Sequence, residues 1–270
     1  MDEQCLADDT SGAAGGVVLV LDYPGRRAEA PVSSLGLESH GYTVHYLLKP
    51  PFPRLLTAAS YAEGLLDGHG SSGGRVLAVL AYCMAAPIAQ EVAASIRAAG
   101  GAPVPLVLFD GEPATARAIE EQYVLASEKL GELLGLTGEE RTPPPAFDAA
   151  LIRDEPEEAL RRGHEGLLEL GERAAAHGEA AVARAEAKAV ADFYRDWLGH
   201  LIAAHNACWS HWGGPAVQIV SRDHSCAPDW PGATATRTVR VAASRNDLLV
   251  HPDVLSTVLS TLRKGSGHAI

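Results

Sequence analysis

The sequence predicts an α/β fold, a mostly parallel sheet with helices on both faces and a helical insertion. Two observations support this prediction. Short, nearly continuous apolar runs alternate with amphipathic stretches, which is typical of strands that are buried on both faces and joined by helices. Between residues 114 and 207 the strand pattern stops, and Ala, Glu, Leu and Arg dominate. We therefore expect an α/β core of residues 1–113 and 208–270, interrupted by a helical lid insertion of residues 114–207.

The individual elements follow from the same patterns. We expect strands at 17–23, 42–48, 75–82, 104–110, 215–221 and 235–243. We expect helices at 27–40, 56–68, 84–99 and 253–263 in the core, and at 114–135, 146–152, 155–175 and 178–207 in the insertion. Ligands of open parallel sheets bind beyond the carboxyl ends of the strands. Because the insertion leaves from such an end, we expect a lid over the site; the alternative is a helical subdomain without a gating role.

Charge and apolar run length limit the classes of partner. The chain carries 22 Lys and Arg against 34 Asp and Glu, a net charge of −12, whereas nucleic-acid binding requires a basic surface. No apolar run is long enough to span a membrane. The acidic start MDEQCLADDTSG lacks the basic-then-apolar pattern of a signal peptide. We therefore expect a cytoplasmic protein that binds neither nucleic acid nor membrane.

Cys83 is the candidate nucleophile. It lies between a predicted strand and a predicted helix, in the sequence Ala81-Tyr82-Cys83-Met84-Ala85. A sharp strand-to-helix turn that exposes a nucleophile requires small residues two positions before and after it, and both are alanine here. The start of the following helix would favour the thiolate. The alternative is a buried cysteine that packs as a small apolar residue.

Asp110 and His251 complete a candidate triad. Asp110 ends the strand after Cys83, and His251 follows the last strand, so the order is nucleophile, acid, base, as in α/β-hydrolases. Distant positions are expected because the fold brings the strand ends together. Asp223 and His224, on the loop after the fifth strand, are the rival acid and base. His251 could instead cap the helix that follows it.

An oxyanion hole needs two backbone N–H groups that point at one site. We expect one from Met84, the residue after the nucleophile. The second should come from the loop after the first strand. Because Pro24 has no N–H, that donor is Tyr23 or Gly25.

Several segments resemble the thioesterases that release polyketide and nonribosomal peptide chains. These are VVLVLDYPG, LAYCMA, LVLFDGEPA and PAVQIVSRDHSCAPDW, with a helical insertion between the last two and a late histidine. The resemblance covers roughly residues 16–263 and implies that the acid is Asp110 rather than Asp223. With its cysteine, the sequence is similar to the tetramate-forming Dieckmann cyclases, thioesterase-like enzymes of pathways such as tirandamycin and nocamycin. That resemblance implies a catalytic Cys83-Asp110-His251 triad.

The resemblance also implies the reaction. The substrate would be a β-ketoacyl-aminoacyl thioester on a peptidyl carrier domain of a hybrid polyketide/nonribosomal peptide synthetase. The product would be a tetramic acid, formed by intramolecular C–C bond formation. A thiol suits this chemistry because an acyl group on sulfur stays reactive towards a carbon nucleophile. Two alternatives remain: a cysteine thioesterase that hydrolyses the chain, and a carrier-binding protein without catalysis.

No cofactor is expected. The proposed reaction needs neither a metal nor a dissociable cofactor. The four cysteines are widely spaced, without a C-x-x-C pair, so a zinc site or disulfide framework is not predicted.

Overall fold

A sheet of six parallel strands forms the centre of the molecule. The computed structural model describes residues 16–23, 28–68, 74–143, 147–176 and 180–266. The strand order is β2-β1-β3-β4-β5-β6, and each neighbouring pair is parallel. The strands are β1 Val17–Leu21, β2 Thr43–Tyr46, β3 Val76–Tyr82, β4 Leu106–Phe109, β5 Ala216–Val220 and β6 Thr236–Arg240. The predicted α/β fold with a parallel sheet is therefore confirmed.

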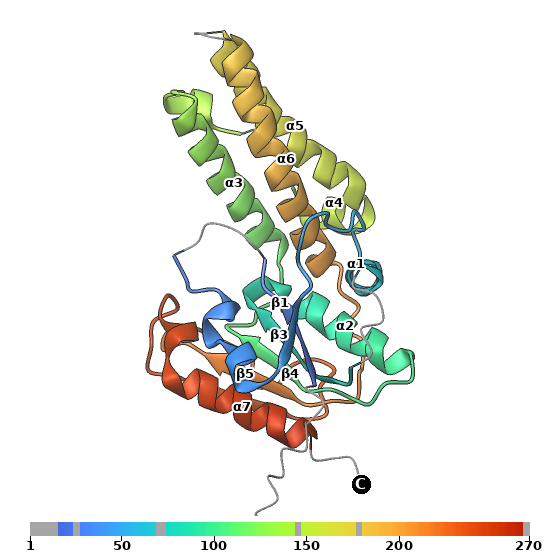
Figure 1. The fold of residues 1–270 in the computed structure, drawn as a ribbon. Coiled ribbons are helices and arrows are strands. Elements are labelled where there is room, and N and C mark those ends of the chain that lie inside the picture. Colours follow the sequence, from blue (N-terminus) through green and yellow to red (C-terminus); the bar gives the residue numbers. More distant parts are fainter. Residues whose placement is uncertain (1–15, 24–27, 69–73, 144–146, 177–179, 267–270) are drawn as a thin grey trace, which may run out of the picture.

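Helices cover both faces of this sheet. Helices α1 and α2 lie on one side, and α7 lies on the other, as Figure 1 shows. Their bounds are α1 Ala58–Asp67, α2 Ala86–Ala98 and α7 Pro252–Ser266. Within β1, Val18 and Val20 face the α7 side, whereas Val17 and Leu19 face the side of α1 and α2. All four are buried, so the continuous apolar run of this strand reflects burial of both faces.

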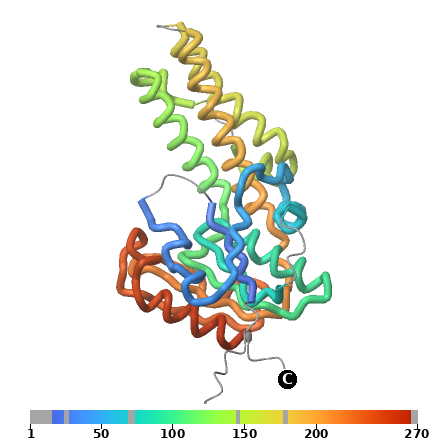
Figure 2. Tube along the Cα trace, viewed as in Figure 1, coloured from blue at the N-terminus to red at the C-terminus, as the bar shows by residue number. Residues whose placement is uncertain are grey.

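The helical insertion lies between β4 and β5. It contains α3 Ala116–Leu133, the 3-10 helix η4 Gly138–Arg141, α4 Ala149–Asp154, α5 Pro156–Ala175 and α6 Ala180–His205. Helices α3, α5 and α6 rise together from one end of the sheet (Figures 1 and 2). Apolar residues of the insertion, among them Ile119, Leu167 and Leu198, belong to the same core cluster as Ile88 of α2. The insertion is therefore packed onto the α/β core, and its opening as a lid stays a prediction.

The predicted helix at 27–40 is wrong in its described part. Two short 3-10 helices stand there, η1 Val32–Leu35 and η2 Leu37–His40. Gly36 lies between them with φ +59°, a left-handed conformation that ends the first helix. The Asp22 carboxylate accepts a hydrogen bond from the Val32 N–H at 2.7 Å and anchors this segment to the end of β1.

Smaller differences concern the ends of elements. The predicted strand at 235–243 is shorter, because β6 spans only Thr236–Arg240. The predicted helix at 146–152 is α4, which begins at Ala149, where the Asp148 side chain accepts a hydrogen bond from the Leu151 N–H. No helix in the described part of the chain is long and apolar enough to cross a bilayer.

Candidate functional site

Cys83 occupies a tight turn between β3 and α2. Its φ is +55°, a left-handed conformation that costs a non-glycine residue roughly 1–3 kcal/mol and is concentrated at functional sites. A short 3-10 helix, η3 Cys83–Ala85, leads into α2. Ala81 and Ala85 are both buried. The sequence therefore forms the predicted sharp strand-to-helix turn, with the thiol at its apex.

Two charged side chains contact the thiol. The Cys83 S–H donates to Glu112 Oε1 at 3.0 Å, and the Arg245 Nη2–H donates to Cys83 Sγ at 2.7 Å. Burial raises the pKa of the thiol to about 12. The charge of Arg245 opposes this increase in pKa, the charge and hydrogen bond of Glu112 add to it, and the Met84 backbone N–H lowers it. Cys83 is therefore a protonated thiol at neutral pH, and the expectation that the start of the following helix would favour the thiolate is wrong, because burial outweighs it.

Arg245 is held in place by further contacts. Its Nε donates to the Tyr82 hydroxyl at 3.2 Å, and its guanidinium lies 5.7 Å from the centre of the Tyr82 ring. It also lies 3.7 Å from a carboxylate oxygen of Glu29 and 3.5 Å from one of Glu112. These contacts come from three separate segments of the chain, so the position of the cation is set by tertiary structure.

Asp110 lies at the carboxyl end of β4, as predicted. It has φ +44° and no exposed surface. Its carboxylate accepts hydrogen bonds from the Ser221 N–H at 2.7 Å and from the Ser221 hydroxyl at 2.8 Å. Asp110 thereby ties the ends of β4 and β5 together. The rival acid, Asp223, is exposed.

His251 is not joined to the rest of the predicted triad. It follows η5 Leu248–Val250, and its Nδ1 accepts a hydrogen bond from the Asp253 N–H at 3.3 Å. Its Nδ1 also lies 3.7 Å from the Asp253 carboxylate. Within the described residues no hydrogen bond links His251 to Cys83 or Asp110. The observed contact is that of a helix cap, which was the alternative, and the role of His251 as a base stays a prediction.

The rival base, His224, makes no such link either. Its ring nitrogen Nε2 is buried without a hydrogen-bond partner among the described residues. Two hydrogen bonds fix the backbone of His224. The His224 N–H donates to the Ser221 carbonyl, and the Arg240 side chain donates to the His224 carbonyl. The next residue, Ser225, lines the pocket in front of Cys83.

The thiol opens onto a pocket of about 840 Å³. The α/β core contributes Arg245 and the turn at Cys83, while α3 and α6 of the insertion form the opposite wall. Both residues predicted for the oxyanion hole, Tyr23 and Met84, line this pocket. Gly25, the other candidate donor, lies outside the described residues. That the N–H groups of Tyr23 and Met84 point at one site stays a prediction.

An aromatic group with buried polar atoms contributes Tyr23, Trp197 and His200 to the lining of this pocket. The His200 ring stacks on Trp197 at 5.5 Å and lies 5.1 Å from the Tyr23 ring and 5.6 Å from the Tyr61 ring. His200 has no exposed surface, and burial lowers its pKa to about 3, so the ring is neutral. Among the described residues, both His200 ring nitrogens and the two tyrosine hydroxyls lack a hydrogen-bond partner.

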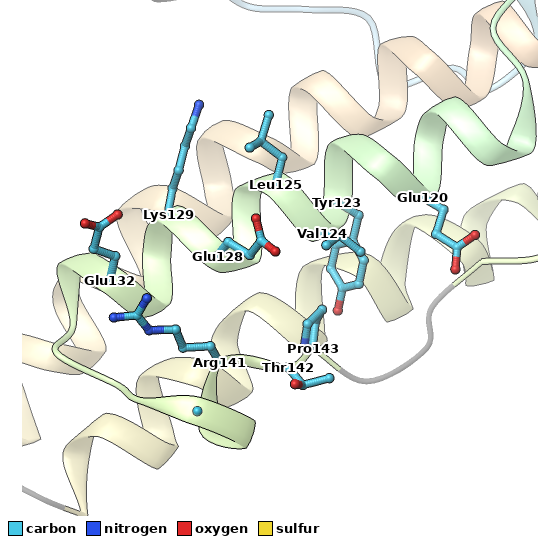
Figure 3. Close-up of a pocket in the computed structure, with 11 residues that line it drawn as sticks. Glu120, Tyr123, Val124, Leu125, Glu128, Lys129, Glu132, Arg141, Thr142 and Pro143 are labelled. Carbon is cyan, nitrogen blue, oxygen red and sulfur yellow. The ribbon is translucent and has the colours of Figure 1, made fainter.

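A second cavity of about 740 Å³ lies within the insertion, between α3 and the segment around η4. Figure 3 shows residues that line it, among them Tyr123 of α3, whose ring lies near Pro143. Cys83 is not among its lining residues. Among the described residues there is also no group of three or more His, Cys, Asp or Glu side chains that could hold a metal.

Known structures share this architecture. The NocB thioesterase domain, in a covalent complex with a fluorophosphonate nocardicin G analog, aligns over 94% of this chain and 96% of its own, with a TM-score of 0.50 and 18% identity. A mutant of a Pseudomonas aeruginosa protein provisionally classed as an epoxide hydrolase aligns over 93% and 90%, with a TM-score of 0.50 and 16% identity. The chain has the α/β-hydrolase fold. No protein-family model and no curated protein matches the sequence.

Sequence reasoning missed two residues that contact the thiol within this α/β-hydrolase fold. Glu112 follows β4 by a few residues, and Arg245 lies in the loop after β6. A signal was present, since both are charged residues on loops at the carboxyl ends of strands, where ligands of parallel sheets bind. The loop after β6 does reach Cys83, but it presents Arg245 there rather than His251.

Proposed function

We propose that this protein processes a carrier-bound acyl thioester through a covalent adduct on Cys83. The observation that supports it best is the thiol at the apex of a strained turn, facing a pocket walled by the helical insertion. The fold of a thioesterase domain that forms a covalent complex is consistent with this chemistry. A peptidyl carrier domain would deliver the substrate, with the insertion acting as a lid.

In its specific form, the proposed reaction is a Dieckmann cyclisation to a tetramic acid. The Cys83 sulfur attacks the aminoacyl thioester carbonyl, its proton leaves, and the carrier thiol departs with a proton. The acidic carbon between the two carbonyls of the chain then loses its proton and attacks the Cys83 thioester. The ring closes, and the Cys83 sulfur leaves and regains a proton. Water must stay out, because hydrolysis of the adduct would release a linear acid instead.

Thiol chemistry supports cyclisation over hydrolysis. A thioester is less stabilised by resonance than an oxygen ester, so a Cys83 adduct stays a good acceptor for a carbon nucleophile. The predicted triad would assign proton transfer to His251 and orientation of His251 to Asp110. Backbone N–H groups of Met84 and Tyr23 would stabilise the oxyanion. The two oxyanion roles remain part of the proposal. Proton transfer by His251, oriented by Asp110, is one of two alternatives, the other being transfer to a group that contacts the thiol directly.

The test uses a pantetheine thioester of a β-ketoacyl amino acid, which mimics the carrier-bound substrate. We expect the unaltered protein to form the cyclic product and Cys83→Ala to form none. The control is Cys208→Ala, because Cys208 is exposed and lies outside the residues that line the pocket. A linear acid as the sole product would support a hydrolytic thioesterase. Catalysis would be rejected altogether if neither product formed and intact mass spectrometry detected no Cys83 adduct.

A further inference from the structure

Cys83, Glu112 and Arg245 form a compact charged group at the apex of the turn. The thiol is 3.0 Å from a Glu112 oxygen and 2.7 Å from an Arg245 nitrogen, and these two charged groups are 3.5 Å apart. Each of these two contacts to sulfur is a hydrogen bond. By contrast, the observed partner of the His251 ring is Asp253. The thiol therefore already touches a carboxylate that can accept a proton.

Proton transfer within this group would create no additional net charge. At rest, the neutral thiol lies beside one carboxylate and one guanidinium, so the charges of the three groups sum to zero. After the proton moves from Cys83 Sγ to Glu112 Oε1, a thiolate and a guanidinium remain beside a neutral carboxylic acid, and the sum is again zero. The negative charge moves from Glu112 to the sulfur and stays beside Arg245, so the transfer separates no new pair of opposite charges.

We propose that Glu112 is the general base and acid of the thiol, and that Arg245 is the cation that stabilises the thiolate. This inference rests on the proposed function. Glu112 accepts the S–H proton as the sulfur attacks the carrier thioester, and it then returns that proton to the departing carrier thiol. In the second half, Glu112 accepts the proton of the acidic carbon and gives it to Cys83 Sγ as the new C–C bond forms. Each half-reaction leaves Glu112 ionised again.

The surroundings fit these roles. Arg245 donates to the Tyr82 hydroxyl and lies near Glu29. Its guanidinium is therefore held in place by contacts other than the one with Glu112. Burial raises the pKa of the Cys83 thiol to about 12, which makes an adjacent proton acceptor necessary. The same balance of causes predicts opposite effects for the two charged partners, since Glu112 raises the pKa of the thiol and Arg245 lowers it.

The experiment measures two rates on each variant. The first is release of free thiol in the first turnover, with enzyme in excess over an N-acetylcysteamine thioester of a β-ketoacyl amino acid. The second is alkylation of Cys83 by iodoacetamide, followed by mass spectrometry. For Glu112→Gln we expect thiol release to fall by about 10²- to 10⁴-fold, the usual contribution of a general base. We expect alkylation to become about three- to tenfold faster, because loss of the negative charge lowers the thiol pKa.

The other variants separate this role from a structural one. For Arg245→Met we expect both rates to fall, because the thiolate loses its cation. Glu112→Asp keeps a carboxylate and should retain more activity than Glu112→Gln. His251→Ala discriminates between the two candidate bases: a base at His251 predicts a loss of about 10²- to 10⁴-fold in this variant, whereas a base at Glu112 predicts a smaller loss than in Glu112→Gln. Glu172→Gln and Arg184→Met are matched controls, because these residues form an exposed pair on the insertion at 2.9 Å.

Three outcomes would overturn the inference. One is thiol release by Glu112→Gln that matches the unaltered protein. Another is a large loss in His251→Ala alone. The third is a loss in Glu112→Asp equal to that in Glu112→Gln, which would indicate a structural role. If the unaltered protein releases no thiol, the proposed function fails, but the alkylation rates still test the inference. Alkylation of Glu112→Gln and Arg245→Met at the rate of the unaltered protein would reject an effect of the two charged groups on Cys83.

Discussion

Burial of His200 predicts a specific sensitivity of the protein to acid. Its pKa falls from 6.5 to about 3 because the ring is fully buried. In acid the unfolded chain therefore binds a proton that the folded protein does not. The stability associated with the neutral ring is complete above pH 6.5 and is lost progressively as the pH falls towards 3. The difference between a pKa of 6.5 in the unfolded chain and about 3 in the folded protein corresponds to about 5 kcal/mol of unfolding free energy in total.

The perturbation that tests this is His200→Phe, which replaces the ring without a group that titrates. Between about pH 7 and about pH 4, we expect the unaltered protein to lose about 3 kcal/mol more unfolding free energy than the variant. The assay is urea unfolding followed by tryptophan fluorescence at each pH. His211→Phe, on the exposed surface, controls for the change of residue type. An equal loss in both proteins would refute the reasoning, since it would mean that the His200 ring ionises in the folded state.

Two further predictions concern packing and the strand ends. Asp110→Ala leaves the buried Ser221 N–H without its acceptor, so we expect a loss of about 1–3 kcal/mol in urea unfolding. Asp110→Asn should lose less than half as much, because the amide oxygen can accept this N–H and the Ser221 hydroxyl can reverse; equal losses would contradict this reasoning. At Gly171 an added Cβ would lie 2.4 Å from the Ala187 Cβ, so Gly171→Ala should destabilise the α5–α6 contact by about 1–3 kcal/mol. Gly199→Ala, where the nearest atoms are 3.7 Å away, is the control and should not lower the melting temperature; a matching loss there would contradict the packing argument.

Much of the fold was predictable because its signals are local. Apolar runs of strand length mark segments buried on both faces, and the parallel sheet follows from their alternation with helices. The turn at Cys83 was predictable because small residues at Ala81 and Ala85 accommodate a sharp reversal. The helix predicted at 27–40 failed for a local reason as well, since Gly36 adopts a left-handed conformation there and divides the segment.

The sequence by itself determined the α/β core, the helical insertion after β4 and the position of Cys83 at a strand end. Only the tertiary structure decided which side chains meet the thiol. Glu112 and Arg245 come from loops after two different strands, and their meeting depends on how the sheet orders those strands and how each loop folds. In the same way, strand order placed Ser221 on Asp110, while local helix capping drew His251 to Asp253. Contacts between distant loops depend on three-dimensional packing, which no local pattern of residues encodes.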